Sequence, residues 1–130
     1  MKFIVCLDES NTSKAASGLA AKYAAVFNAD LTLVTSMLKG TENEKKKIDA
    51  AEKQLNDLKT TYESDGISCN THLLIRGLSA GEDLVDFAKE QKADQIFIGI
   101  KRRSKVEKLV FGSTAQYVIL HADCPVVTVK

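Results

Sequence analysis

The residues best suited to chemistry in this chain lie in its C-terminal third, between two glycines. Gly99 ends an apolar run, and Gly112 comes directly before Ser113 and Thr114 and a helical pattern. The segment between the glycines carries five cationic side chains and one acidic one. A helix start presents unpaired backbone N–H groups and the positive end of the helix dipole, which together bind phosphate. The segment 98–114 therefore predicts a loop that can hold a phosphate group.

A second candidate is the acidic turn after the first apolar run. Asp8 ends the run KFIVCLD and is followed by the polar residues ESNT. A carboxylate at this position can accept hydrogen bonds from sugar hydroxyls or help to hold a magnesium ion. Structural roles explain the same residues: Asp8 can cap a helix or form an Asx-turn, a Gly-Ser pair can simply begin a helix, and Gly99 can simply end a strand. The residue types alone leave both interpretations open.

Apolar runs and helix-spaced patterns alternate along the whole chain. Short runs rich in β-formers predict strands, and apolar residues spaced by three and four predict helices that pack on a sheet. The expected strands cover residues 2–8, 30–37, 67–77, 93–100 and 125–129, and the expected helices cover residues 11–27, 41–65, 79–92 and 113–122.

This alternation predicts βαβ crossovers and a parallel sheet with helices on both faces. Ligands of such folds bind outside the carboxyl ends of the strands, where the strand order reverses. Only the first and fourth strand ends combine a polar anchor with glycine or helix-start chemistry, which places the crevice between them and predicts the order 3-2-1-4-5. A length of 130 residues suits one domain. We therefore expect a three-layer α/β/α domain over residues 1–130.

Polar residues at the helix starts, and apolar residues along one helix face, predict local detail. Asn11 or Thr12 is expected to cap the first helix, and Ser113 the last. Ser79, with Glu82 three residues later, has the spacing of a capping box. On the first helix, the spacing predicts a buried face formed by Ala16, Leu19, Ala20, Tyr23 and Phe27.

Composition argues against several classes of protein. The formal net charge is +1, so the molecule as a whole has no basic surface for nucleic acid or an anionic membrane. No apolar run approaches the roughly 18 residues of a membrane-spanning helix. Met1 and Lys2 lead straight into the first predicted strand, which does not resemble a secretory signal. Three cysteines cannot all pair within the chain, and the reducing cytoplasm is the expected compartment.

The histidines and cysteines do not form the patterns of catalytic or metal sites. His72 and His121 have no nucleophile at a plausible spacing, and packing is their expected role. Cys6 and Cys69 fall within predicted strands, where cysteine usually behaves as a small apolar residue, and Cys124 is expected to be more exposed. No Cys and His cluster has the spacing of a zinc site, so we expect no metal bound by the protein alone.

Both ends of the chain and the spacing of its glycines resemble the universal stress protein family over essentially the whole length. VCLDES is similar to the family's first strand and polar turn, and FGSTAQYVILHADCPVVTVK is similar to its last helix and strand. Nucleotide-binding members carry Gly, two residues, Gly, nine residues, then Gly and Ser or Thr, and this chain keeps that spacing from Gly99 to Ser113. The resemblance implies a Rossmann-like fold, similar to the adenine nucleotide alpha hydrolases, that binds ATP or a related adenine nucleotide.

The resemblance also implies a set of ligand contacts, with two departures from the family pattern. Arg102 stands where the pattern has its second glycine, and Ser36 stands where an apolar residue is common. The implied contacts are Asp8 to ribose or adenine, Ser36 to adenine, Ile98 and Gly99 to ribose and phosphates, and Gly112, Ser113 and Thr114 to phosphate, with Arg102 beside them.

Arg102 leaves the strength of binding open. If the position requires a positive φ, a non-glycine residue there costs on the order of 1–2 kcal/mol, and its side chain can fill the phosphate volume. A guanidinium can instead form charge-assisted bonds to phosphate, each worth roughly 1.5–3 kcal/mol. These magnitudes overlap, so nucleotide binding and its loss are both consistent with this residue.

The sequence therefore predicts a cytoplasmic regulatory or protective module that binds ATP or a related adenine nucleotide, with or without Mg²⁺. The family often pairs its last strands into homodimers, and the sequence VVTVK suits such an exposed edge. No base is positioned for hydrolysis, so at most slow ATP hydrolysis is expected. The main alternative is a dimeric protein of the same fold that has lost nucleotide binding and acts through a protein partner.

A phosphoacceptor domain and an enzyme of related fold are two further alternatives, and each lacks a required sequence feature. A phosphoacceptor receiver domain needs an acceptor Asp after the third strand, where this chain has LIRG. An adenylating or ATP-pyrophosphatase enzyme on a related fold needs a loop rich in serine and glycine after the first strand, where DESNT has no glycine.

Overall fold

The computed structural model describes residues 1–38, 44–100 and 112–130, so Arg102 lies outside the described residues. Within them, strands and helices alternate as the sequence predicts. The strands are β1 (Lys2–Cys6), β2 (Asp30–Ser36), β3 (Cys69–Leu74), β4 (Gln95–Gly99) and β5 (Val126–Val129), and the helices are α1 (Asn11–Phe27), α2 (Glu44–Ser64), α3 (Ala80–Glu90) and α4 (Ser113–His121).

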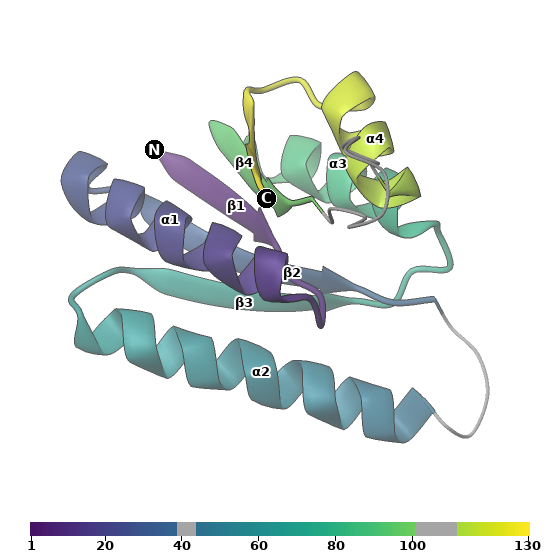
Figure 1. Cartoon of the computed structure of the whole chain (residues 1–130), viewed down its shortest axis with the longest axis horizontal. Coiled ribbons are helices and arrows are strands. Elements are labelled where there is room, and N and C mark those ends of the chain that lie inside the picture. The colour runs from purple at the N-terminus through teal and green to yellow at the C-terminus, as the bar shows by residue number, and fades with distance from the viewer. Residues whose placement is uncertain (39–43, 101–111) are drawn as a thin grey trace.

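The strands form one parallel sheet in the order β3-β2-β1-β4-β5, which confirms the predicted order (Figure 1). The chain adds β2 and β3 on one side of β1 and then returns to add β4 and β5 on the other side. The order therefore reverses between β1 and β4. Cys6, the last residue of β1, pairs with Ile98 near the end of β4, so the carboxyl ends of these strands meet where a ligand site is expected.

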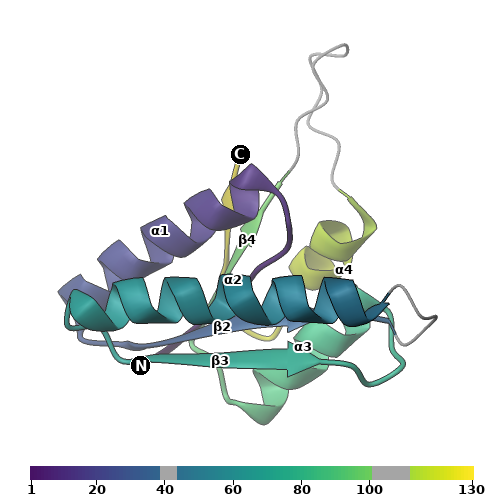
Figure 2. The same ribbon diagram turned by 90° about the horizontal axis from the view of Figure 1, so that it is seen from below.

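Side chains of each strand alternate between two hydrophobic cores. Phe3 and Val5 of β1 point into the core beneath α1 and α2, whereas Ile4 and Cys6 point into the core beneath α3 and α4. Figures 1 and 2 show these two pairs of helices on opposite faces of the sheet. None of the helices in the described segments combines the length and apolar character needed to cross a membrane.

Of the three predicted helix caps, only the cap of α3 is the predicted residue. Ser10, rather than Asn11 or Thr12, caps α1, and its Oγ accepts a hydrogen bond from the backbone N–H of Ser13 at 3.2 Å. Ser79 is the N-cap residue of α3, as predicted, but its side chain makes no capping hydrogen bond, so the predicted capping box is not formed. Gly112 rather than Ser113 occupies the cap position of α4 and offers no capping side chain.

The buried face of α1 is rotated from the predicted one. Tyr23 and Phe27 are 38% and 57% exposed, although each ring packs by its edge on a sheet phenylalanine. Small side chains lie against the sheet instead, because they allow the helix axis to approach it closely. These residues are Ser13, Ala16, Ser17, Ala20, Ala21 and Ala24.

Candidate functional site

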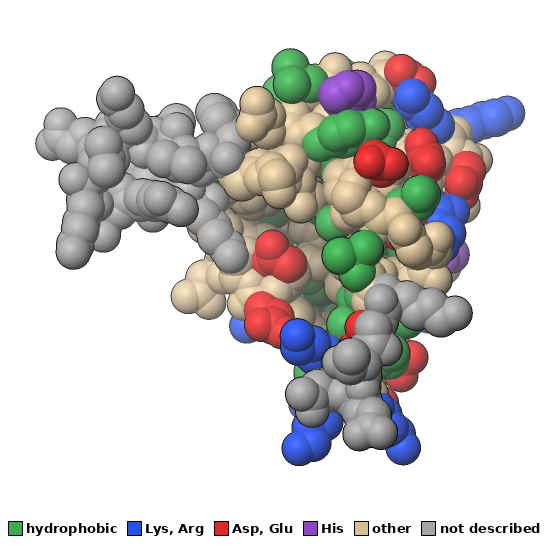
Figure 3. Space-filling view, turned by 90° about the vertical axis from the view of Figure 1, so that its right-hand side faces the viewer, with side chains coloured by type: hydrophobic (Ala, Val, Ile, Leu, Met, Phe, Trp, Pro, Cys, Tyr) green, Lys and Arg blue, Asp and Glu red, His purple; other side chains and the backbone are tan. Residues whose placement is uncertain are grey.

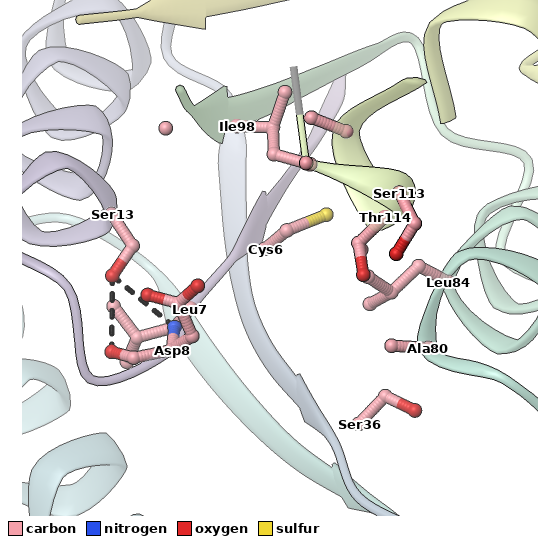
Figure 4. A pocket seen from close by; sticks show the side chains of 13 residues that line it. Cys6, Leu7, Asp8, Ser13, Ser36, Ala80, Leu84, Ile98, Ser113 and Thr114 are labelled. Carbon is pink, nitrogen blue, oxygen red and sulfur yellow. Dashed lines mark hydrogen bonds between the residues drawn. The ribbon is translucent and has the colours of Figure 1, made fainter. Parts of the chain in front are cut away.

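A cavity of about 250 Å³ lies at the carboxyl ends of β1 and β4, beside the starts of α3 and α4 (Figure 4). Figure 3 views the side of the molecule toward which β2 and β3 run in Figure 1, and shows acidic, hydrophobic and uncharged surface near its centre, with Lys and Arg side chains toward the edges. The structure places seven residues of the predicted site on the wall of this cavity: Asp8, Ser36, Ile98, Gly99, Gly112, Ser113 and Thr114.

The start of α4 forms one wall of the cavity. The first helical hydrogen bond joins the N–H of Gln116 to the carbonyl of Gly112 at 3.0 Å. The N–H groups of the three preceding residues therefore have no carbonyl within the helix to bond. Ser113 and Thr114 also bring hydroxyl groups that make no hydrogen bond to another described residue. This wall can bind an anion through backbone and side-chain donors together.

The turn after β1 forms the facing wall, with Asp8 across the cavity from Ser113 and Thr114 in Figure 4. Asp8 Oδ1 accepts hydrogen bonds from the backbone N–H of Ser10, at 2.7 Å, and from its hydroxyl. This is the Asx-turn that the sequence left open as a structural role. The Asp8 side chain nevertheless remains exposed at the cavity wall, so the turn holds a negative charge in place beside the space.

Ser13 locks the same turn from the first turn of α1. Its Oγ lies 3.0 Å from the carbonyl oxygen of Asp8 and 2.9 Å from that of Ser10, and it accepts from the Asp8 N–H at 3.2 Å. The Ser13 side chain is buried, at 2% exposure. The loop conformation is therefore determined by internal hydrogen bonds.

Gly99 has a packing role that the sequence interpretation did not include. A Cβ atom at this position would lie 2.5 Å from the carbonyl carbon of Thr12 and 2.6 Å from the nitrogen of Ser13. The start of α1 therefore rests directly on the end of β4, and only a residue without a side chain fits between them. Close backbone approach, rather than ligand contact, is sufficient to explain this glycine.

Ser36 joins the cavity wall to a network of hydrogen-bonded polar side chains that the sequence interpretation missed. Its hydroxyl donates to Asp83 Oδ2 at 2.8 Å, and Asp83, on α3, is fully buried. Arg76, which follows β3, donates to the other oxygen of Asp83 and forms two bonds of 3.0 Å to Glu90. These hydrogen bonds to Asp83 and Glu90 raise the pKa of Arg76.

The signal for this network was present in the helical pattern of α3. Asp83 falls among Leu84, Phe87 and Ala88, all of which are buried. A carboxylate on the apolar face of a helix requires a buried partner, because an unpaired charge there is very costly. Arg76, seven residues before Asp83 in the sequence, is that partner.

Cys6 forms the floor of the cavity and is held as a neutral thiol. Burial, the Asp8 carboxylate and the Cys124 thiol raise its pKa from 9.0 to about 12. A thiol in this state is a poor nucleophile. Among the described residues, no group of three or more His, Cys, Asp or Glu side chains could hold a metal ion. The arrangement therefore suits binding of a polar, anionic molecule better than covalent catalysis.

Alkaline pH is expected to destabilise the protein partly through Cys6. Because folding raises the pKa of this thiol from 9.0 to about 12, the unfolded chain releases the proton first as the pH rises. The stabilising contribution is complete below pH 9 and is lost toward pH 12. Between about pH 8 and pH 10, the part of this contribution that is lost amounts to roughly 1.4 kcal/mol. Urea denaturation at both pH values should show a loss smaller by that amount in Cys6→Ala than in the wild type, and equal losses would contradict this account.

In a comparison with known protein families, residues 1–130 of this chain match the universal stress protein family. A universal stress protein of Methanocaldococcus jannaschii is 38% identical over 76 residues, which cover 58% of this chain. The matched segment covers 44% of that relative, so it spans less than half of the relative's length.

Two solved structures of a universal stress protein from Archaeoglobus fulgidus are similar to almost the full chain. One has a TM-score of 0.89 and 34% identity, with 100% of this chain and 98% of that chain covered. The other, in complex with dAMP, has a TM-score of 0.82 and 32% identity, with the same coverage of both chains.

Proposed function

This chain belongs to the universal stress protein family, and from that premise we propose that its cavity binds ATP or a related adenine nucleotide. The phosphates would lie at the start of α4, against Gly112, Ser113 and Thr114. The sugar and base would extend toward Asp8 and Ser36. The protein would act as a single-domain regulatory or protective module in the cytoplasm, rather than as an enzyme.

The observation that carries this proposal is the uncapped start of α4, which faces an acidic turn across one cavity. Donor groups at one wall and an acceptor at the other match the two ends of a nucleotide, because phosphates accept hydrogen bonds and ribose hydroxyls donate them. The similar structure that contains dAMP supports the same ligand class.

Magnesium would enter with a nucleoside triphosphate rather than bind alone. Asp8 is the one carboxylate among the described residues on the cavity wall. Mg²⁺ is commonly held by one or two carboxylates together with phosphate oxygens and water. Asp8 and the phosphates would supply that combination, and the ion would offset the charge of the phosphates near the carboxylate.

Replacing Thr114 by Val is expected to weaken ATP binding about fivefold to tenfold. The substitution keeps the side-chain shape and removes one hydroxyl donor to phosphate, worth roughly 1–1.5 kcal/mol. Isothermal titration calorimetry with ATP, with and without Mg²⁺, measures the change. Thr60→Val is the matched control, because Thr60 is exposed on α2 and does not line the cavity.

The same titrations separate the proposal from its rival. ATP binding to the wild type that falls in Thr114→Val, but not in Thr60→Val, supports the α4 site. Binding to Arg102→Gly but not to the wild type would favour a protein that has lost the nucleotide and acts through a partner. No binding to either would contradict the proposed nucleotide function.

We further propose that β5 pairs with β5 of a second copy, and Thr128→Pro is expected to convert that dimer to a monomer. The carbonyl of Pro125, directly before β5, accepts from the N–H of Ile96 at 3.0 Å, and the carbonyl of Val129 accepts from the N–H of Ile100, directly after β4, at 2.7 Å. By the alternation of a parallel ladder, the N–H of Thr128 points away from β4, toward the open edge. Proline removes that donor, whereas Thr128→Val retains it and should remain dimeric. Native mass spectrometry measures both, and a monomeric wild type would contradict the proposal.

A further inference from the structure

The part of the cavity at Ser36 indicates which nucleotide base the protein selects. This inference rests on the proposed nucleotide site. Ser36 is the last residue of β2 and lines the cavity. In Figure 4 it lies beyond Ala80 as seen from Ser113 and Thr114. A ligand whose phosphates meet the start of α4 would therefore present its other end to Ser36.

The direction of the hydrogen bond made by Ser36 is fixed by its partner. Asp83 is 0% exposed, and its carboxylate forms a salt bridge with Arg76. An ionised carboxylate can only accept hydrogen bonds, so the Ser36 hydroxyl must be the donor in their 2.8 Å contact. A hydroxyl group has one proton. Any further hydrogen bond of the Ser36 oxygen, including one to a ligand in the cavity that Ser36 lines, must therefore be one that it accepts.

Arg76 holds Asp83 in the orientation that makes this possible. Its Nε donates to Asp83 Oδ1, and its Nη2 donates to the Asp83 carbonyl at 3.1 Å. Its Nη1 contacts both carboxylate oxygens of Glu90 at 3.0 Å. The guanidinium is thus held between two acidic residues of α3, which leaves Asp83 Oδ2 facing Ser36.

We propose that Ser36 is a specificity-determining acceptor that selects a base with an exocyclic amino group, and that Asp83 and Arg76 are positioning residues for it. A serine without such a partner can rotate its proton and either donate or accept. The buried carboxylate removes that freedom. An amino group of the base then gains a partner, whereas a base with only hydrogen at the same position leaves the Ser36 oxygen without one.

The test compares ATP with purine riboside 5′-triphosphate, which lacks only the amino group. In calorimetric titrations the wild type should bind ATP about fivefold to tenfold more tightly, the typical value of one hydrogen bond. Ser36→Ala should bind the two nucleotides within about twofold of each other. Ser36→Thr keeps the hydroxyl and should keep the preference.

Asp83→Asn tests the positioning role through the ratio of the two nucleotide affinities. A residue that only stabilised the fold would not change this ratio. The amide of asparagine can donate a hydrogen bond to the Ser36 oxygen. The Ser36 hydroxyl can then turn its own proton toward the cavity and act as a donor. The preference for ATP should therefore fall to about twofold, while purine riboside 5′-triphosphate still binds.

The outcomes separate this inference from the function on which it rests. Equal affinities of the wild type for both nucleotides, or a preference that survives in Ser36→Ala, would overturn the inference and leave nucleotide binding intact. The wild-type comparison requires no substitution, so a variant that fails to fold cannot hide the result. Failure of both nucleotides to bind the wild type would overturn the proposed function and the inference with it.

Discussion

Gly99→Ala is expected to lower the free energy of unfolding by about 3 kcal/mol or more, at or beyond the upper end of overpacking costs. The added Cβ would lie 2.5 Å from a backbone carbon of Thr12. A flexible side chain could move aside, but the backbone of Thr12 is held in the first turn of α1, so the helix itself must shift. Urea denaturation followed by circular dichroism measures the loss, which is a substantial fraction of the 5–15 kcal/mol typical of a whole domain.

Gly18→Ala is the matched control for this variant. Gly18 lies within α1, and a Cβ there meets no heavy atom within 4 Å. Alanine should stabilise the helix by roughly 0.5–1 kcal/mol, because glycine is the poorer helix former. A Gly99→Ala protein as stable as the wild type would contradict the close approach of α1 and β4.

Arg76→Met is expected to cost about 3 kcal/mol, more than the reciprocal substitution Asp83→Asn, at about 1 kcal/mol. Losing the guanidinium leaves a fully buried carboxylate without its cation, and breaking buried pairs in this way typically costs 3–5 kcal/mol. We expect a cost at the lower end of this range because the Arg76 side chain is 33% exposed. Asparagine leaves no uncompensated charge and keeps an acceptor for Arg76. Urea denaturation of both variants measures the asymmetry.

Lys53→Met provides a surface comparison. Lys53 pairs with Asp57 at 2.9 Å, but the two side chains are 78% and 65% exposed. Such pairs contribute about 0–1 kcal/mol. The double variant Arg76→Met and Asp83→Asn should cost less than the sum of its two parts, since no buried charge remains unpaired. An Arg76→Met protein that loses no more stability than Lys53→Met would show that the Asp83 network does not stabilise the fold.

Sequence pattern was sufficient for the order of the strands because the informative residues sit at strand ends. Asp8 and Gly99 marked the two ends between which the order reverses, and the observed sheet has that order. The set of residues around the cavity followed from the same reasoning, since parallel strands bring their carboxyl ends to one edge. Their roles in ligand binding remain predictions.

Details that depend on the distance between elements were not predictable from single-sequence patterns. Periodicity placed Tyr23 and Phe27 on the buried face of α1, but close packing of the helix on the sheet favours small side chains there. The choice of Ser10 as the cap depends on the path of the turn after β1. The pairing of Ser36 with Asp83 joins residues 47 positions apart, which no local spacing shows.

The hydrogen bonds that Ser13 makes to the Asp8 turn have a consequence for the kinetics of binding. This half of the cavity is preorganised, so a ligand that reaches it does not have to order the loop and loses little affinity to conformational entropy. Association at this wall should proceed without waiting for a loop rearrangement. Ser13→Ala would leave the turn free to fluctuate, and its effect should appear as a slower on-rate rather than as the loss of a ligand contact.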